Sequence, residues 1–581
     1  MRKLPEFDAV RDIRLRKDPY FDAWVYNFMT ENNLEHLMNP TLIATPEQLR
    51  FMVALADDQI YVPCSDETFR LMCAPETPRD LQKQYNRAWR IIMRLVRSAT
   101  DIEKQVKRRI LQYCRHRFRL HISQHTTIPS RVVKRLTSIV LTQSGQEDPW
   151  TGRKQAANRK ARALLQDHAL QRLLRRPPAT LDPHRDIVDM RWELDLTELV
   201  RLLHVAMHGR QWVQCPPSPL EVEQAMESVG EPSAQLRLLF GPETEPRKKI
   251  LYLCDGDGGV MFDLAIVRVL LRMGHQVVLA LKEGFFFYAP MIWDMESDPT
   301  LKEEMESAFV LHDDRVSKND LLRHLREHRF VVISDGTRER LNLYRASVTF
   351  ARSWKECDVV MAKGWRADNI FLRTSHQFTR DIVCFWGEDD GQCNIVCKPR
   401  ATGVRKFTEK DLAGKASEII EAMRAARQAG KAVMFYSCII GSIPGQTKTA
   451  IAVVDAFVRH LREKLDTTFI VNPAEHFEEG MDGDDLMFMW ERVQRSGLID
   501  IWRFQTVEDI ETSFALQERK VPSAWSGKDA TYSTGCTKEM QIALDMQKKH
   551  RELQIIGPSP DNFFRRREYG VGKYFDVGIS G

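Results

Sequence analysis

The sequence predicts an α/β protein in three parts: a mostly helical N-terminal region (residues 1–240), a doubly wound α/β domain (245–402) and a second, Rossmann-like α/β domain (405–581). Three observations predict it. Apolar residues recur at helical spacing through the first part, and a glycine-rich turn joins two short apolar runs near residue 250. From there on, short apolar runs alternate with helical segments. A chain of 581 residues also exceeds what one hydrophobic core usually supports.

The N-terminal part has apolar side chains on one face of several expected helices. Phe21, Val25 and Phe28 form one such face, and Ile92 and Leu95 belong to another. Two basic stretches, 107–119 and 153–176, carry apolar residues at the same spacing. We interpret both as amphipathic helices with solvated basic faces rather than as nucleic-acid-binding surfaces.

Composition narrows the class of protein further. A formal net charge of +5 is too small to indicate a nucleic-acid partner by itself. No run approaches the roughly 18 apolar residues of a membrane span, so we expect no membrane partner. The first residues lack the apolar segment of a secretion signal. The eleven cysteines are scattered and lack metal-ligand spacing, which is typical of reduced thiols in a cytoplasmic protein.

The glycine-rich turn follows the apolar run 250–254 and contains Asp255 and Asp257. A helix-periodic segment runs from there to Met273 and ends at Gly274, before a second apolar run at 276–281. This order predicts a strand–turn–helix–strand unit, with the two carboxylates at the carboxyl end of the first strand. They can hold a hard cation, or they can simply close the turn and cap the helix.

Four short motifs in residues 145–405 agree in order and spacing with one known family. They are Asp148-Pro-Trp150 with Lys154, the turn 255–258 with Phe262-Asp263, the strand 358–364 ending in Lys363-Gly364, and Lys398. In these residues the chain resembles the metal-dependent damage-control phosphatases, the family of domain of unknown function 89. The resemblance implies an α/β fold with an N-terminal helical bundle, and hydrolysis of small phosphate esters.

The resemblance also implies roles for individual residues. A divalent metal (Mn, Co, Ni or Mg) would be held by Asp255, the one family ligand that this chain keeps. Asp257 or Asp294 would substitute for the missing ligands, although the family Asp that matches Asp294 is not usually a ligand. Lys363, Arg366 and Lys398 would bind phosphate near it, so that Asp255 and these three residues form the expected catalytic set. For Lys363 and Arg366 the alternative is a surface salt bridge, and for Lys398 an ordinary loop charge.

The chain departs from the family at the metal ligands. The family's Asn after the first Asp is Gly256 here, and its Asn-Asp pair after the second strand falls on Tyr288 and Ala289. An alanine offers no ligand atom, and one carboxylate holds a divalent ion poorly. A second hypothesis is therefore a catalytically degenerate member that binds a ligand or regulates a protein partner.

The C-terminal part contains another candidate anion site. An apolar run at 431–440 leads into a turn with Gly441, Gly445, Lys448 and Thr449, and then into a helix. Free amides at a helix N-terminus and a lysine suit the phosphate of a metabolite or nucleotide, but an ordinary strand–helix turn is the alternative. The spacing is not that of a P-loop. An acidic loop at 475–485 is interpreted as solvated rather than as a metal site.

Overall fold

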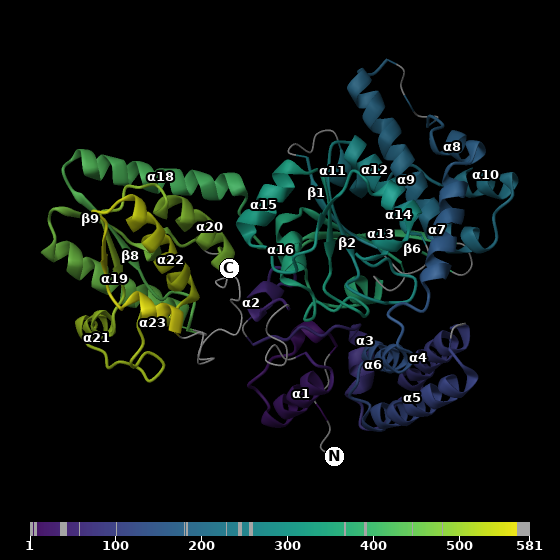
Figure 1. Ribbon diagram of the computed structural model, residues 1–581, viewed down its shortest axis with the longest axis horizontal. Helices are drawn as coiled ribbons and strands as arrows, with labels where there is room; N and C mark the ends of the chain where they lie inside the picture. Colours follow the sequence, from purple (N-terminus) through teal and green to yellow (C-terminus); the bar gives the residue numbers. More distant parts are fainter. Residues whose placement is uncertain are drawn as a thin grey trace. The chain divides into compact units, whose positions relative to one another are not determined.

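The structure is a computed structural model that describes residues 4, 8–34, 43–56, 58–99, 102–178, 181, 184–227, 229–241, 247–254, 259–364, 368–388, 392–443, 446–478 and 480–565. The chain divides into two compact units, residues 1–402 and 403–581 (Figure 1). The first unit contains both the N-terminal helices and the first sheet, where the sequence suggested two separate parts.

The N-terminal part of the first unit is helical, as its apolar spacing predicts. A single turn of 3-10 helix, η1 (Val10–Asp12), is followed by α1 (Pro19–Glu31), α2 (Pro46–Leu49), α3 (Asp66–Met72), α4 (Arg79–Ser98), α5 (Lys104–Gln124), α6 (Pro129–Ser144), α7 (Thr151–Leu165), α8 (His168–Leu174), α9 (Ile187–Gln214), α10 (Pro219–Glu227) and α11 (Ala234–Phe240). Side chains cap several helix starts. Asp18, for example, accepts hydrogen bonds from the first amides of α1.

Within the described residues the first unit has a seven-stranded sheet in the order β3-β4-β2-β1-β5-β6-β7. The strands are β1 (Lys249–Leu253), β2 (Gln276–Leu281), β3 (Phe309–Leu311), β4 (Phe330–Ser334), β5 (Val359–Lys363), β6 (Asp381–Gly387) and β7 (Cys393–Lys398). Neighbouring strands are parallel except β7, which runs antiparallel to β6. The intervening helices are α12 (Val260–Arg272), α13 (Asp294–Ser297), α14 (Pro299–Glu304), α15 (Lys318–Glu327), α16 (Val348–Glu356) and the short π-helix η3 (Asp368–Leu372).

Both faces of this sheet are buried. Alternate residues of β1 belong to two different cores, Leu251 to one and Tyr252 to the other. The first core includes residues of α1 and α3–α6, whereas the second includes residues of α7–α12. The N-terminal helices therefore cover the sheet on both faces, which explains why they form one unit with it.

The second unit is also an α/β fold, with a smaller sheet than the first. Among the described residues it has a four-stranded parallel sheet in the order β11-β10-β8-β9, made of β8 (Ala432–Ser437), β9 (Thr468–Val471), β10 (Ile501–Phe504) and β11 (Gln554–Ile556). Its helices are α18 (Glu409–Gln428), α19 (Thr447–Lys464), α20 (Gly483–Gln494), α21 (Val507–Leu516), α22 (Thr534–Lys549) and α23 (Pro560–Arg565), with short 3-10 turns η4 (Pro473–His476) and η5 (Ala530–Tyr532). The predicted α/β class is thus confirmed for the chain.

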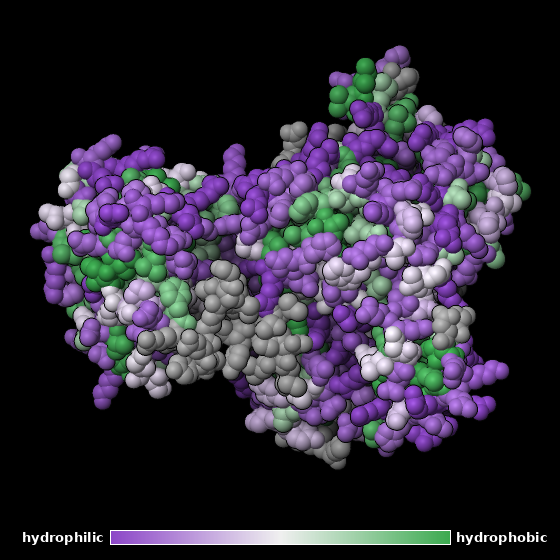
Figure 2. Space-filling model, in the orientation of Figure 1, coloured by the Kyte–Doolittle hydropathy of each residue, from purple (hydrophilic) through white to green (hydrophobic). Residues whose placement is uncertain are grey.

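The surface agrees with the composition. The face shown in Figure 2 is mostly hydrophilic, with apolar side chains in scattered patches. In the described part of the chain, no helix combines the length and the apolar character that a membrane crossing requires. All eleven cysteines lie within the described residues, and none forms a disulfide.

Candidate functional site

The strand order places a switch point at the carboxyl edge of the first sheet. From β1 the chain continues to β2 on one side, and it returns to β5 on the other side of β1. Ligands of doubly wound sheets bind at such a point. The loops that follow β1 and β5 contain Asp255, Asp257 and Arg366, which lie outside the described residues.

Lys363, at the end of β5, is buried and already paired. Its ammonium group lies 2.8 Å from Oδ1 of Asp263 in the first turn of α12, and it also donates to the carbonyl oxygen of Gly259 at 3.3 Å. The Tyr252 hydroxyl donates to the same Asp263 oxygen at 2.8 Å. Lys363 is therefore at the predicted edge, but its charge is neutralised within the protein rather than by a surface partner.

Asp294 also has a cation beside it. Both of its carboxylate oxygens accept hydrogen bonds from the Lys154 ammonium, at 2.9 and 2.7 Å, and Asp148 lies 2.5 Å from the same nitrogen. Burial raises the pKa of Asp294, and the lysine opposes that shift. The motif residues Asp148 and Lys154 thus meet Asp294 in one buried ion cluster, and the metal-ligand role of Asp294 stays a prediction.

Lys398 holds a loop together. Its ammonium donates to three carbonyl oxygens, those of Phe371 (2.7 Å), Thr374 (3.0 Å) and His376 (2.9 Å). Burial lowers the pKa of Lys398 to about 8. An ammonium has three N–H donors, so this arrangement leaves none for a phosphate group.

Two of the three positions that depart from the family's metal ligands contribute to packing, whereas Gly256 lies outside the described residues. Ala289 is buried, and the ring of Tyr288 lies 4.5 Å from that of Trp150. Trp150 belongs to the first motif, so aromatic contacts link this motif to the loop after β2.

The same edge carries a group of acidic residues beyond β2. Burial, together with the nearby carboxylates of Glu283 and Asp335, raises the pKa of Asp314 to about 7. Asp335 is paired with Lys282 at 2.5 Å. The Thr349 amide donates to the Asp314 carbonyl at 3.0 Å, so the turn at 312–314 packs against α16.

A cationic cluster on this edge was not predicted. Arg131 and Lys134 of α6 meet Arg345, from the loop after β4, around the buried carboxylate of Glu339. Arg131 forms a buried salt bridge with Glu339 at 2.5 Å, whereas the half-buried Arg345 side chain forms no hydrogen bond or ion pair with any described residue. Burial and the charge of Arg131 lower the pKa values of both Lys134 and Arg345.

The sequence does not predict this cluster, because Glu339 and Arg345 lie more than 200 positions after the two basic residues of α6. Arg131 and Lys134 are one helical turn apart, which places them on one face of α6. That spacing is the only signal the sequence offers, and it does not identify the partner loop. The fold brings the two segments together because side chains of α6 and β4 belong to the same core.

In the second unit, the residues of the predicted phosphate turn lie between β8 and α19. Gly441 and Lys448 are exposed and Thr449 is half-buried, whereas Gly445 lies outside the described residues. No side chain caps the start of α19. A Cβ atom at Gly441 would meet nothing within 4 Å, so close packing does not require glycine there. Their role in binding a phosphate stays a prediction.

The acidic loop at 475–485 is used structurally. Asp482 and Asp485 form a capping box at the start of α20, and Glu475 lies 2.6 Å from Arg462 of α19. Asp485 is buried, so the loop is not simply solvated as the sequence predicts, and these carboxylates have structural partners.

A buried polar group lies beneath the turn after β8. Glu539 accepts a hydrogen bond from Nε2 of Gln494 at 2.9 Å, and burial raises the pKa of Glu539. Gln505 accepts a hydrogen bond from the Ile439 amide at 3.1 Å. Nε2 of Gln505 and Oε1 of Gln494 are buried without a hydrogen-bond partner in the described part of the unit.

Comparisons with known proteins give a likeness in structure but none in sequence. No family model matches the chain, and no curated protein matches it. Among solved structures it is similar to a DUF89 family protein from Pyrococcus horikoshii. The two are 18% identical, the match covers 52% of this chain and 90% of that one, and the TM-score is 0.37.

Proposed function

We propose that the first unit binds a small phosphorylated metabolite at the carboxyl edge of its sheet, as a damage-control-phosphatase-like protein. The observation that supports this best is the cationic cluster of Arg131, Lys134 and Arg345 around one carboxylate. Three positive side chains against Glu339 leave an excess of positive charge where water is partly excluded. A phosphate group supplies the opposite charge and accepts charge-assisted hydrogen bonds from guanidinium groups.

Arg345 is the group we expect to contact the phosphate. Arg131 is held by Glu339, and the Lys134 ammonium donates to the Ser138 hydroxyl at 3.1 Å. The Arg345 guanidinium keeps its planar set of donors unused within the described residues. A bidentate contact with phosphate oxygens uses such a set fully.

Metal-dependent hydrolysis of the bound phosphate ester is a second candidate function. Asp255 and Asp257 favour it, since two carboxylates on a glycine-rich turn suit a hard divalent ion that would polarise the phosphoryl group. Against it stand Ala289 at a ligand position and Asp294, which Lys154 already neutralises. The contacts therefore favour binding without turnover.

Calorimetry of the full chain tests the binding function. Sugar phosphates, nucleotides and inorganic phosphate would be titrated into wild type and Arg345→Gln. We expect at least one phosphate ester to bind, and Arg345→Gln to weaken it roughly 10- to 100-fold, because a hydrogen bond to a charged group contributes about 1.5–3 kcal/mol. Arg323→Gln is the matched control, because Arg323 is exposed and pairs with Asp320. Equal affinity in wild type and Arg345→Gln, or no binding at all, would contradict the proposal.

Phosphate release separates the two candidates. Wild type and Asp255→Asn would be assayed with Mn²⁺, Co²⁺, Ni²⁺ and Mg²⁺ on every ester that binds. Turnover that disappears in Asp255→Asn supports the hydrolase. Binding without turnover under all four metals removes that candidate and leaves a ligand-binding protein.

A further inference from the structure

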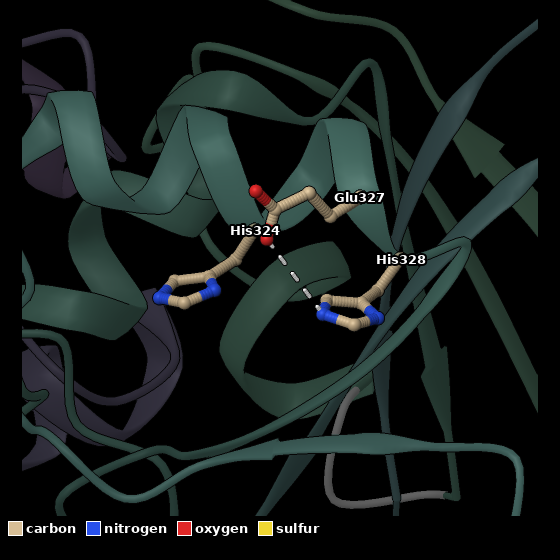
Figure 3. Close-up of side chains that lie close together, drawn as sticks. All are labelled: His324, Glu327 and His328. Atoms are coloured by element: carbon tan, nitrogen blue, oxygen red, sulfur yellow. Dashed lines mark ion pairs between the residues drawn. The ribbon is translucent and has the colours of Figure 1, made fainter.

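We propose that His324, Glu327 and His328 form a binding site for a borderline divalent metal ion of the Zn²⁺ class. The three residues lie at the C-terminal end of α15, near β3 at the edge of the first sheet (Figure 3). One ligand atom from each lies within 4.8 Å of the others. The proposal does not depend on the phosphorylated ligand of the first unit.

Two of the three side chains share one face of α15, because residues three positions apart are neighbours on a helix surface and His324 precedes Glu327 by three. His328 follows the helix as its C-cap residue, in extended conformation. The His-x-x-Glu-His order offers two imidazoles and a carboxylate, which is a ligand set typical of zinc. Figure 3 shows the Glu327 carboxylate between the two imidazole rings, with its ion pair to His328 at 4.0 Å.

Phe309 of β3 holds both rings in place. Its ring centroid lies 4.6 Å from that of His324 and 4.2 Å from that of His328, and the planes are inclined by 22° and 1°. The imidazoles are half-buried, so they lose little further freedom when they bind an ion. The ligand atoms thus start from a partly organised arrangement.

One ring nitrogen lacks a partner. Nδ1 of His324 is buried and forms no hydrogen bond with any residue that the structure describes. A buried nitrogen without a partner has a free-energy cost, which a metal–nitrogen bond would remove. This observation is independent of the spacing and points to a ligand at the same place.

The surrounding charges permit a cation. The carbonyl groups at the end of α15 carry the negative end of the helix dipole, and the His328 amide donates to the His324 carbonyl at 2.9 Å. The guanidinium groups of Arg323 and Arg329 are bound elsewhere, the first to Asp320 and the second to the carbonyl oxygen of His275.

Little movement is needed to complete the site. Ligand atoms at about 2.0–2.2 Å from a tetrahedral zinc ion are roughly 3.3 Å apart, so the present arrangement must contract. The exposed Glu327 side chain can rotate to achieve this, and water fills the fourth position.

The test uses the full chain, freed of metal by chelation and dialysis. Zn²⁺ would be titrated calorimetrically, and Co²⁺ would replace it to record the absorption of a tetrahedral site. Variants are His324→Asn, His328→Asn and Glu327→Gln, with His312→Asn as the control histidine, which is exposed and stacks on Trp293. Melting temperature is recorded with and without Zn²⁺.

We expect one Zn²⁺ equivalent in wild type that raises the melting temperature. Removing either histidine should weaken binding by at least roughly 100-fold, since loss of a mere supporting partner already costs 10- to 100-fold. Glu327→Gln should weaken it about tenfold without disturbing the fold, because that side chain is exposed. His312→Asn should bind as wild type does. Wild-type binding in the two histidine variants, or no bound equivalent in wild type, would overturn the proposal.

Discussion

At the scale of single residues, the carboxyl edge of the first sheet has three buried ion pairs among its described residues. Lys154, Lys363 and Lys282 each lie beside a buried aspartate, at 2.7, 2.8 and 2.5 Å. Removing one partner of such a pair typically costs 3–5 kcal/mol, because the other charge stays buried without compensation. Substitutions at these lysines will therefore destabilise the fold, and any loss of function in such variants must be compared with their loss of stability.

His376 makes the stability of the first unit dependent on pH. It is buried, its Nε2 accepts a hydrogen bond from the Val62 amide at 2.9 Å, and burial lowers its pKa to about 4. The unfolded chain, with an ordinary histidine pKa near 6.5, takes up a proton first on acidification. The contribution of His376 is thus fully present above pH ~6.5 and is lost as pH falls toward ~4.

His376→Gln should flatten this dependence, since a glutamine oxygen can accept the Val62 hydrogen bond and does not titrate. Urea unfolding of both proteins between pH 7.5 and 4 would measure it. Between these limits we expect wild type to lose about 3 kcal/mol more than the variant. Parallel pH profiles for the two proteins would contradict this assignment.

At the scale of elements, the close approach of α9 and α12 depends on one glycine. A Cβ atom at Gly209 would lie 2.6 Å from Cδ2 of Phe262, whose ring is fully buried. Neither helix can move apart from the other without opening a void, because both pack in the second core of the unit. The glycine therefore sets the distance between the two helices.

Gly209→Ala should destabilise the protein by about 1–3 kcal/mol through overpacking, although alanine is the better helix former. Gly152→Ala is the matched control, because that glycine lies in α7 and its Cβ would meet nothing within 4 Å. It should stabilise by about 0.5–1 kcal/mol. Chemical unfolding of both variants measures the difference, and a Gly209→Ala protein as stable as wild type or more stable would show that packing at Gly209 is not limiting.

At the scale of the whole molecule, the chain has two units with separate sheets and separate cores. The second unit buries aromatic side chains such as Trp502 and Trp525 completely. A parallel sheet covered by helices and supplied with its own core meets the usual requirements of an independent domain.

We expect a fragment of residues 403–581 to fold by itself. It should unfold in one cooperative transition, followed by tryptophan fluorescence, because Trp502 and Trp525 leave fully buried environments together. If the full chain unfolds cooperatively but the fragment does not, the second unit depends on the first for its folding.

The sequence predicts the fold better than the site. The apolar runs of β1 and β5 and the helix before Gly274 lie where their patterns place them, because strand and helix periodicity is local information. The pairing of Lys363 with Asp263 joins residues 100 positions apart, and Arg131 and Arg345 are farther apart still. Such contacts depend on the packing of whole layers, which short motifs do not encode. The sequence also suggests that residues 1–240 form a separate part, because their helical pattern is local. No local pattern shows that these helices cover both faces of the sheet.

The bond between Lys363 and Asp263 constrains how this chain can change over generations. A lineage can lose the pair only through an intermediate in which one charge is left alone at the centre of the unit, with the Tyr252 hydroxyl also affected. That intermediate would give up about 3–5 kcal/mol, a large share of the 5–15 kcal/mol that holds a typical domain folded. Among descendants of a common ancestor, positions 263 and 363 should therefore be inherited as a unit, and where one is exchanged the other should be exchanged too.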